Sequence, residues 1–144
     1  MTSDPFDLDR FLSAHKSVYE QVLKELRAGR KTSHWMWFVF PQLAGLGQSA
    51  NSRRYALRGR DEARAYLAHP QLGTRLKQCL RLVLASGAQD IDEIFGPPDD
   101  LKFRSCLTLF AAVAPAEALF SEALERFFAG VPDARTLELL GASG

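Results

Sequence analysis

The chain has 144 residues, a length typical of a single domain, and 47% of its residues are hydrophobic while 24% are charged. This balance excludes a disordered or fibrous chain, and the formal net charge of +1 gives no reason to expect nucleic acid or an anionic membrane as a partner. The N-terminus lacks the pattern of a signal peptide, and no apolar run approaches the roughly 20 residues of a membrane span, so we expect one cytoplasmic domain over residues 1–144, with its core at about 5–140.

The first third of the chain predicts two helices before an aromatic segment. Asp4 followed by Pro5 favours a helix start, because an aspartate cap and a proline in the first turn both suit a helix N-terminus. Ser17 and Glu20 have the spacing of a capping box, and the apolar positions after them predict a helix that ends at Gly29.

Residues 33–42 form the densest apolar stretch of the chain. They include both tryptophans and two of the ten phenylalanines. The pattern suits a buried strand as well as a short buried helix. Thr32 and Ser33 as caps, Pro41 as a terminator and the lack of a partner strand favour the helix. We expect this segment to form the centre of the core.

The rest of the chain predicts further short helices around this segment. Ser49 or Asn51 caps one helix that runs to Leu57, Asp61 caps another, and a longer helix follows over residues 70–85. After a single turn at 90–96, the sequence predicts a long central helix at 101–113, a helix at 119–128 and a last helix capped by Asp133. The predicted fold class is all-α, a compact multihelical array of about eight short helices.

Polar residues at the entrance of the aromatic segment suggest an anion site. Arg30 and Lys31 end one predicted helix, where they complement its dipole, but they also precede the Thr32/Ser33 start of the next element, whose free amides attract anions. His34 is either a hydrogen-bonded core residue or a general acid or base.

Trp35 and Trp37 are either core residues or a stacking platform for a flat ligand. Gln42, Gly47 and Ser49 follow them, and the glycine turn at 45–47 only superficially resembles a phosphate-binding loop.

The long late helix carries a second set of polar residues. Asp100, Arg104 and Thr108 are four residues apart and therefore share one face, with Lys102 and Ser105 nearby. Asp100 is the candidate carboxylate that would orient His34 or activate water. Whether this stripe faces a pocket or solvent stays open at the level of sequence.

No metal or cofactor is expected. His15, His34 and His69 lack the spacing of a zinc site. Cys79 and Cys106 stand in apolar contexts, so we expect two buried thiols rather than a disulfide or a catalytic thiol.

The strings 34–43 (HWMWFVFPQL), 45–49 (GLGQS), 94–102 (IFGPPDDLK) and 107–110 (LTLF) resemble a bacterial family of uncharacterised proteins, domain of unknown function 1810. The resemblance runs from Phe6 to Leu140. It implies a compact, nearly all-helical domain and no established activity. Family members often have a second serine and a methionine where this chain has Cys106 and Leu107, which leaves Ser105 alone. Some members carry the label calpastatin, but a disordered inhibitor does not fit a chain with this apolar content.

We therefore expect a small anionic or nucleotide-like ligand to bind between the segment 34–49 and the helix 99–108. The reaction, if there is one, would be that of a hydrolase or transferase, with His34 and Asp100 as the catalytic pair. The alternative is a protein-interaction module whose function lies on its outer helical faces. The expected ligand-binding residues are Arg30, Lys31, Ser33, Trp35, Trp37, Gln42, Gly47, Ser49, Lys102, Arg104 and Ser105.

Overall fold

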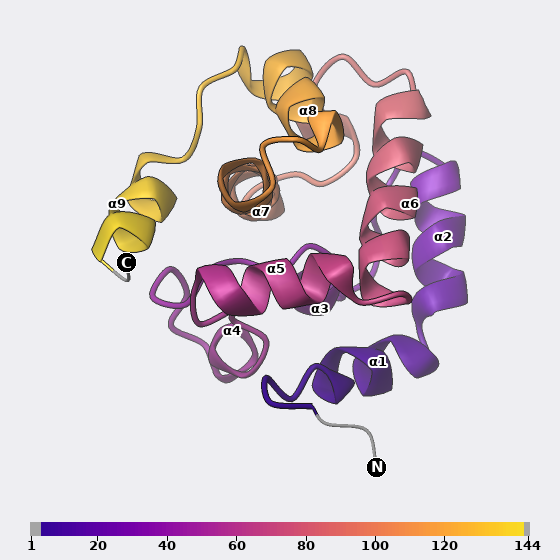
Figure 1. Cartoon of the computed structure of the whole chain (residues 1–144). Coiled ribbons are helices and arrows are strands. Elements are labelled where there is room, and N and C mark those ends of the chain that lie inside the picture. Colours follow the sequence, from indigo (N-terminus) through magenta and orange to yellow (C-terminus); the bar gives the residue numbers. More distant parts are fainter. Residues whose placement is uncertain (1–3, 143–144) are drawn as a thin grey trace.

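The computed structural model describes residues 4–142, which are mostly helical (Figure 1). In this range the chain forms α1 Asp9–Lys16, α2 Tyr19–Arg27, α3 Met36–Val39, α4 Ala50–Arg54, α5 Arg60–Ala68, α6 Leu72–Ala85, a 3-10 turn at Ile91–Glu93, α7 Asp99–Val113, α8 Ala118–Phe128 and α9 Ala134–Ala142. These described residues contain no β-strand, and an isolated bridge joins Leu43 to Leu57. The predicted all-α class is confirmed, with nine α-helices in residues 4–142 where the sequence predicted about eight.

Helix α7 is the centre of the fold. It contacts α5, α8 and α9, and Figure 1 shows it end-on between the other helices. Its buried residues point in nearly every direction around the helix axis, as expected for a helix surrounded by protein. The two buried hydroxyls, on Ser105 and Thr108, each donate to the carbonyl one turn earlier. The predicted central helix is confirmed, and it begins at Asp99.

The aromatic segment packs against α7 and is only partly buried. Trp35, Met36, Val39 and Phe40 are buried, whereas Trp37 and Phe38 are half-buried. The reason is that α3 is a single turn, so its successive side chains point in different directions. The Phe40 ring meets the Phe103 ring of α7 at a centroid distance of 5.1 Å. The helical interpretation of this segment is confirmed.

Two predicted helix caps are present in the structure. The Ser49 hydroxyl accepts a hydrogen bond from the backbone N–H of Ser52 at the start of α4. The Asp133 carboxylate does the same for Thr136 at the start of α9. Both caps satisfy an amide that has no partner inside its helix, as their residue types predict.

The predicted capping box at Ser17 and Glu20 is wrong. The backbone N–H of Val18 donates to the carbonyl of His15, so residues 15–18 form a tight connection, and α2 begins only at Tyr19 without a side-chain cap. A capping box occurs instead at Asp90 and Glu93. The predicted Asp61 cap is also wrong, because α5 begins one residue earlier and places Asp61 in its first turn.

The first helix starts later than predicted. The Asp4 carboxylate accepts hydrogen bonds from the backbone N–H groups of Leu8 and Asp9, so it acts as a cap. Residues 4–7 form a turn with Asp7 at φ 51°, a left-handed conformation that cannot continue a helix. As a result α1 begins at Asp9, and Pro5 is not in its first turn.

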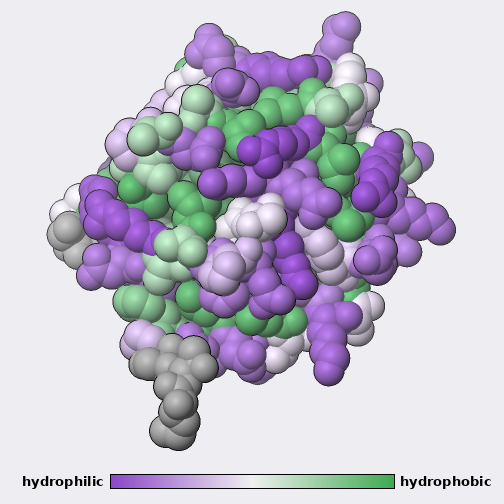
Figure 2. Space-filling view, turned by 45° about the vertical axis from the view of Figure 1, so that its right-hand side comes forward, coloured by the Kyte–Doolittle hydropathy of each residue, from purple (hydrophilic) through white to green (hydrophobic). Residues whose placement is uncertain are grey.

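The surface of the molecule mixes hydrophilic and hydrophobic side chains. On the face that Figure 2 shows, hydrophobic residues are interspersed among hydrophilic ones. Among the residues that the structure describes, the large hydrophobic side chains that are exposed are Leu101, Val131 and Leu137. Each helix within residues 4–142 is too short or too polar to cross a lipid bilayer.

Candidate functional site

Two adjoining hollows lie between the segment 31–52 and the start of α7. The first has a volume of about 330 Å³ and the second of about 220 Å³. Pro98 and Lys102 line both hollows, so we name the two together the Lys102 groove. The other residues of the first hollow are Lys31, Thr32, Ser33, His34, Met36, Trp37, Pro97 and Asp99, and those of the second are Gln42, Leu46, Gly47, Ser52, Leu101 and Ser105.

Two ammonium groups and one carboxylate set the charge of the groove. Lys31 Nζ lies 2.7 Å from one Asp99 oxygen, and Lys102 Nζ lies 3.6 Å from the other. The Lys31 side chain is only 7% exposed and its charge is matched by Asp99, whereas Lys102 is 25% exposed and less closely paired. The groove therefore carries an excess positive charge, and Lys102 is the cation that a ligand can reach.

The two tryptophans have separate roles. Trp35 is buried, with Lys31 Nζ 5.1 Å from its ring centroid, so its ring cannot stack on a ligand. Trp37 is half-buried and lines the first hollow, with Lys102 Nζ 5.4 Å from its ring centroid. Of the two tryptophans, Trp37 is the one that offers a flat apolar surface to the groove.

Glu25 of α2 fixes the backbone at the entrance of the groove. Its carboxylate accepts hydrogen bonds from the N–H groups of Thr32 (2.7 Å) and Ser33 (3.0 Å), the Ser33 hydroxyl, Trp35 Nε1 (3.0 Å) and Gln21 Nε2 (2.9 Å). Burial by itself raises the pKa of Glu25, but the hydrogen bonds from Ser33, Thr32, Gln21 and Trp35 together lower this pKa to about 2. Glu25 is therefore ionised at neutral pH, and the Ser33 hydroxyl is already bonded to it.

His34 is exposed at the edge of the first hollow. Within the described chain its side chain has no hydrogen bond or ion pair, so no neighbouring group fixes the orientation or tautomer of the imidazole. It can reach a ligand in this hollow. In the absence of a ligand it lacks the orienting partner that acid–base sites commonly have.

The structure places Asp99, and not Asp100, in the hollow with His34. Consecutive helical residues point about 100° apart, and Asp100 lines neither hollow. Instead the Asp100 carboxyl lies beside Asp92 and raises the pKa of Asp92 through a hydrogen bond and its negative charge. Arg30, which the sequence also assigns to the site, is exposed and lines neither hollow.

The second hollow contains two of the predicted residues at the end of the aromatic segment and just after it. Gln42 and Gly47 line it, whereas Ser49 lies outside and caps α4. Gly47 allows a close approach, because a Cβ there would lie 2.4 Å from the Cβ of Ser52. Ser105 also lines this hollow, with its hydroxyl donating to the Leu101 carbonyl at 3.0 Å.

The polar stripe of α7 holds the chain before α9. Arg104 donates from Nε to the Val131 carbonyl at 2.9 Å and from Nη2 to the Pro132 carbonyl at 3.3 Å. Thr108 is buried, and its hydroxyl accepts a hydrogen bond from the backbone N–H of Asp133 at 2.8 Å. The residues of the stripe therefore do not line the Lys102 groove. Arg104 and Thr108 instead have a structural role, because they bind the backbone before α9.

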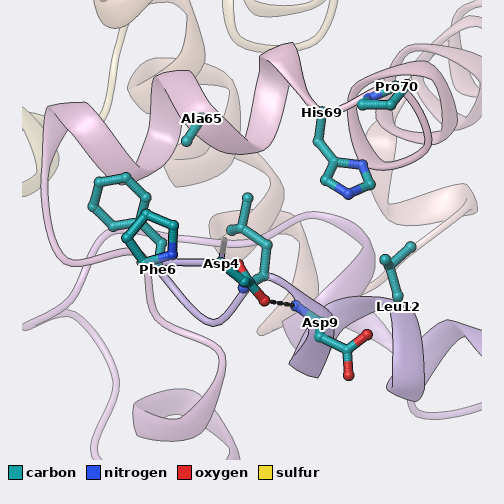
Figure 3. A pocket seen from close by; sticks show the side chains of 9 residues that line it. Asp4, Phe6, Asp9, Leu12, Ala65, His69 and Pro70 are labelled. Atoms are coloured by element: carbon teal, nitrogen blue, oxygen red, sulfur yellow. Dashed lines mark hydrogen bonds between the residues drawn. The ribbon is translucent and has the colours of Figure 1, made fainter. Parts of the chain in front are cut away.

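A larger hollow lies elsewhere, between residues 4–12 and α5 (Figure 3). It has a volume of about 690 Å³ and a mostly apolar lining that includes Phe6, Leu12 and Ala65. Its polar groups are largely used within the fold, since Asp4 caps the first turn and His69 Nδ1 accepts backbone N–H groups at the start of α6.

The described residues contain no group of three His, Cys, Asp or Glu side chains that could hold a metal ion. Both cysteines are free and buried, as predicted. Burial raises the pKa of Cys79 to about 11 and also raises the pKa of Cys106, so neither thiol is a reactive thiolate at neutral pH.

Comparison with known families decides the classification. The model of a family described as "Protein of unknown function (DUF1810)" matches residues 5–140. The chain belongs to the DUF1810 family. No curated protein matches it. A crystal structure of the conserved hypothetical protein Rv1873 from Mycobacterium tuberculosis is similar, with 52% sequence identity and a TM-score of 0.94. The match covers 96% of this chain and 99% of that one. The resemblance seen in the sequence is confirmed, and neither description names an activity.

In this DUF1810 protein the most important residue that the sequence did not reveal is Glu25. Glu25 lies three residues after Val22 and next to Leu26, on the apolar side of its helix. Val22 and Leu26 are both buried. A carboxylate on a buried face must be paired, so its position was the available signal. The pairing of Lys31 with Asp99 gave no such signal, because the two residues are far apart in the sequence.

Proposed function

We propose that this DUF1810 protein binds a small ligand with an anionic group and a flat or apolar part in the Lys102 groove. The position of Lys102 carries the proposal. Lys102 lines both hollows, and its ammonium group lies over the Trp37 ring. Asp99, the carboxylate among the lining residues, is shared between Lys31 at 2.7 Å and Lys102 at 3.6 Å, so two ammonium groups face one negative charge. An anion beside Lys102 would balance the remaining positive charge.

The other lining residues fit a ligand of mixed character. Trp37 and the 59% exposed Leu101 supply apolar surface, and Gln42 supplies an amide that can donate or accept hydrogen bonds. The two hollows together fall within the size range of small-molecule sites. A nucleotide-like or carboxylate ligand suits this combination of charge and apolar surface.

Binding is better supported than catalysis. A hydrolase or transferase would use His34 as the general acid or base, but the neighbouring carboxylate in the hollow, Asp99, is paired with Lys31 and Lys102. The proposed catalytic pair of His34 and Asp100 would need a rearrangement of the start of α7. We therefore propose a ligand-binding protein as the primary function.

A thermal-shift screen of nucleotides, sugar phosphates and carboxylates tests the proposal. A ligand present at about 100 times its dissociation constant should raise the melting temperature by about 5–10 °C. The Lys102→Met variant should need at least about ten times more ligand for the same rise in melting temperature, because a charge-assisted contact is lost. His34→Ala should also reduce it while leaving the fold intact.

Lys24→Met is the matched control, since Lys24 is an exposed lysine of α2 that lines neither hollow. It should respond to ligand like the wild type. A ligand that stabilises the wild type and the Lys102→Met variant equally would bind elsewhere and contradict the proposal. A screen without any stabilising ligand would contradict it as well.

A protein-interaction module is the second candidate. It is favoured by three exposed large apolar side chains. Leu101 belongs to α7, Val131 to the connection before α9, and Leu137 to α9. If this function is the correct one, Leu101→Ser should abolish binding of the partner protein in a pull-down, while the ligand screen gives no stabilisation.

A further inference from the structure

Another hollow, outside the Lys102 groove, is lined by four arginines. It has a volume of about 270 Å³, and we name it the arginine hollow after four of its lining residues. Ser52 of α4 lines the Lys102 groove, whereas the next two residues of the same helix line the arginine hollow. In Figure 1, α4 lies near the turn that precedes α1, and this turn supplies the opposite wall. The lining residues used below are Asp7, Arg10, Arg53, Arg54 and Arg58.

Two of the arginines are held in place by a buried carboxylate. Glu62 is 1% exposed and accepts from Arg10 Nη2 at 2.7 Å and from Arg58 Nε at 2.8 Å. Arg10 also donates to the carbonyls of Arg54 and Ala56, which ties α1 to the end of α4. These guanidinium groups are therefore fixed before any ligand arrives, which lowers the entropic cost of binding.

The hollow has a surplus of positive charge and unused donors. Four guanidinium groups face two carboxylates, Asp7 and Glu62, which leaves two positive charges in excess. Arg53 and Arg54 are exposed, and among residues 4–142 their guanidinium groups have no hydrogen bond or ion pair, although Arg54 lies over the Tyr55 ring. Arg58 is 63% exposed and keeps its Nη1 free of any described acceptor.

Asp7 places its carboxylate among these arginines from a left-handed backbone conformation. Its φ of 51° is uncommon for a residue other than glycine. Its negative charge acts on Arg58, whose pKa is raised mainly by Glu62 and to a smaller extent by Asp7. Asp7 is thus an internal counter-ion that an external anion would have to compete with.

We propose that the arginine hollow binds a small oxyanion with two or more negative charges, of the phosphate type. The planar guanidinium fork matches the geometry of phosphate oxygens, and the surplus of two positive charges matches the charge of such an anion. Two fixed arginines form the base, and the free donors of Arg53, Arg54 and Arg58 contact the anion. This site is separate from the Lys102 groove and does not depend on the function proposed for it.

Calorimetric titration with inorganic pyrophosphate tests this site, with sodium chloride added to equal ionic strength as the reference. The wild type should bind one pyrophosphate per chain. The double variant Arg53→Gln/Arg54→Gln should bind at least about tenfold more weakly, because two charged donors are lost. Asp7→Asn should bind roughly threefold or more tightly, since asparagine accepts the same backbone conformation and removes the competing charge.

Two control variants distinguish this site from unspecific attraction and from binding in the Lys102 groove. Arg27→Gln removes an exposed arginine of α2, and Lys102→Met removes the cation of the groove; both should bind pyrophosphate as the wild type does. Absence of pyrophosphate binding by the wild type would overturn the proposal. So would equal weakening by Arg27→Gln, which indicates unspecific attraction, or weakening by Lys102→Met alone. If the double variant does not fold, tighter binding by Asp7→Asn still supports the site, and unchanged binding by that variant refutes it.

Discussion

At the scale of single residues, Glu25 holds the wall of the groove from outside it. One buried carboxylate binds two successive backbone N–H groups, a hydroxyl and the indole of Trp35. These contacts fix residues 32–35, which connect α2 to α3 and form the entrance of the groove. The position of the groove wall therefore depends on an ionised side chain outside the groove.

Replacement of Glu25 by glutamine should destabilise the protein by roughly 2–4 kcal/mol, because an amide cannot accept all of these hydrogen bonds and leaves buried donors unpaired. The pKa of Glu25 is about 2 in the folded protein and lies near 4.5 in the unfolded chain. Its contribution is therefore complete above pH 4.5 and is lost as the pH falls toward 2.

Urea unfolding at pH 6 and pH 3 measures both effects. The difference in stability between the wild type and Glu25→Gln should be smaller at pH 3. Glu20→Gln is the control, because Glu20 is an exposed residue of the same helix. An equal loss in the two variants would show that Glu25 has no special role.

At the scale of elements, the polar stripe of α7 determines how α9 is attached. Arg104 and Thr108 together bind the carbonyls of Val131 and Pro132 and the N–H of Asp133. Asp133 in turn caps α9. The last helix is thus held by a short chain of hydrogen bonds to the central helix in addition to apolar packing.

Thr108→Val keeps the shape of the side chain and removes its hydroxyl, so the N–H of Asp133 loses its partner. We expect a loss of about 1–3 kcal/mol in the free energy of unfolding. Amide hydrogen exchange should also become faster in α9 than in α6. Thr74→Val is a matched control, because the Thr74 hydroxyl also donates to the carbonyl four residues earlier but binds no amide of another element. Similar effects of the two substitutions would contradict this role of Thr108.

At the scale of the whole molecule, His15 links three elements through a neutral imidazole. His15 lies in α1. Its Nε2–H donates to the Phe38 carbonyl of α3, and its Nδ1 accepts a hydrogen bond from Arg75 of α6. Burial is the main reason that the pKa of His15 falls to about 4, and the positive charge of Arg75 lowers it further, against the opposing effect of the Phe38 carbonyl. Protonation of His15 therefore opposes the packing of these helices.

Acid should weaken the protein first through His15. Because the pKa is about 4 when folded and near 6.5 when unfolded, the unfolded chain takes up the proton first. Stability should be complete above pH 6.5 and fall by roughly 1–3 kcal/mol as the pH drops toward 4. His15→Gln should be less stable at pH 7 but show a flatter profile between pH 6.5 and 4 in chemical unfolding. A variant with the wild-type slope would exclude His15 as the cause.

The sequence predicted the fold class and most of the helices because their signals are local. The caps at Ser49 and Asp133 satisfy amides a few residues away, and the apolar positions of α7 are visible along the chain itself. The sequence also predicted a ligand pocket between the segment 34–49 and the helix 99–108, since polar residues flank the aromatic segment there. Two hollows lie in this region, and the binding of a ligand in them stays a prediction.

Tertiary structure alone decided which of two nearby candidate residues faces the groove. Trp37 rather than Trp35, and Asp99 rather than Asp100, line it, because the rotation of a helix about its axis is set by packing against distant elements. The pairing of Lys31 with Asp99 and the gathering of Arg10, Arg53 and Arg58 around one hollow join residues far apart in the chain. Local sequence determined the helices of this protein, whereas long-range contacts determined where its charges meet.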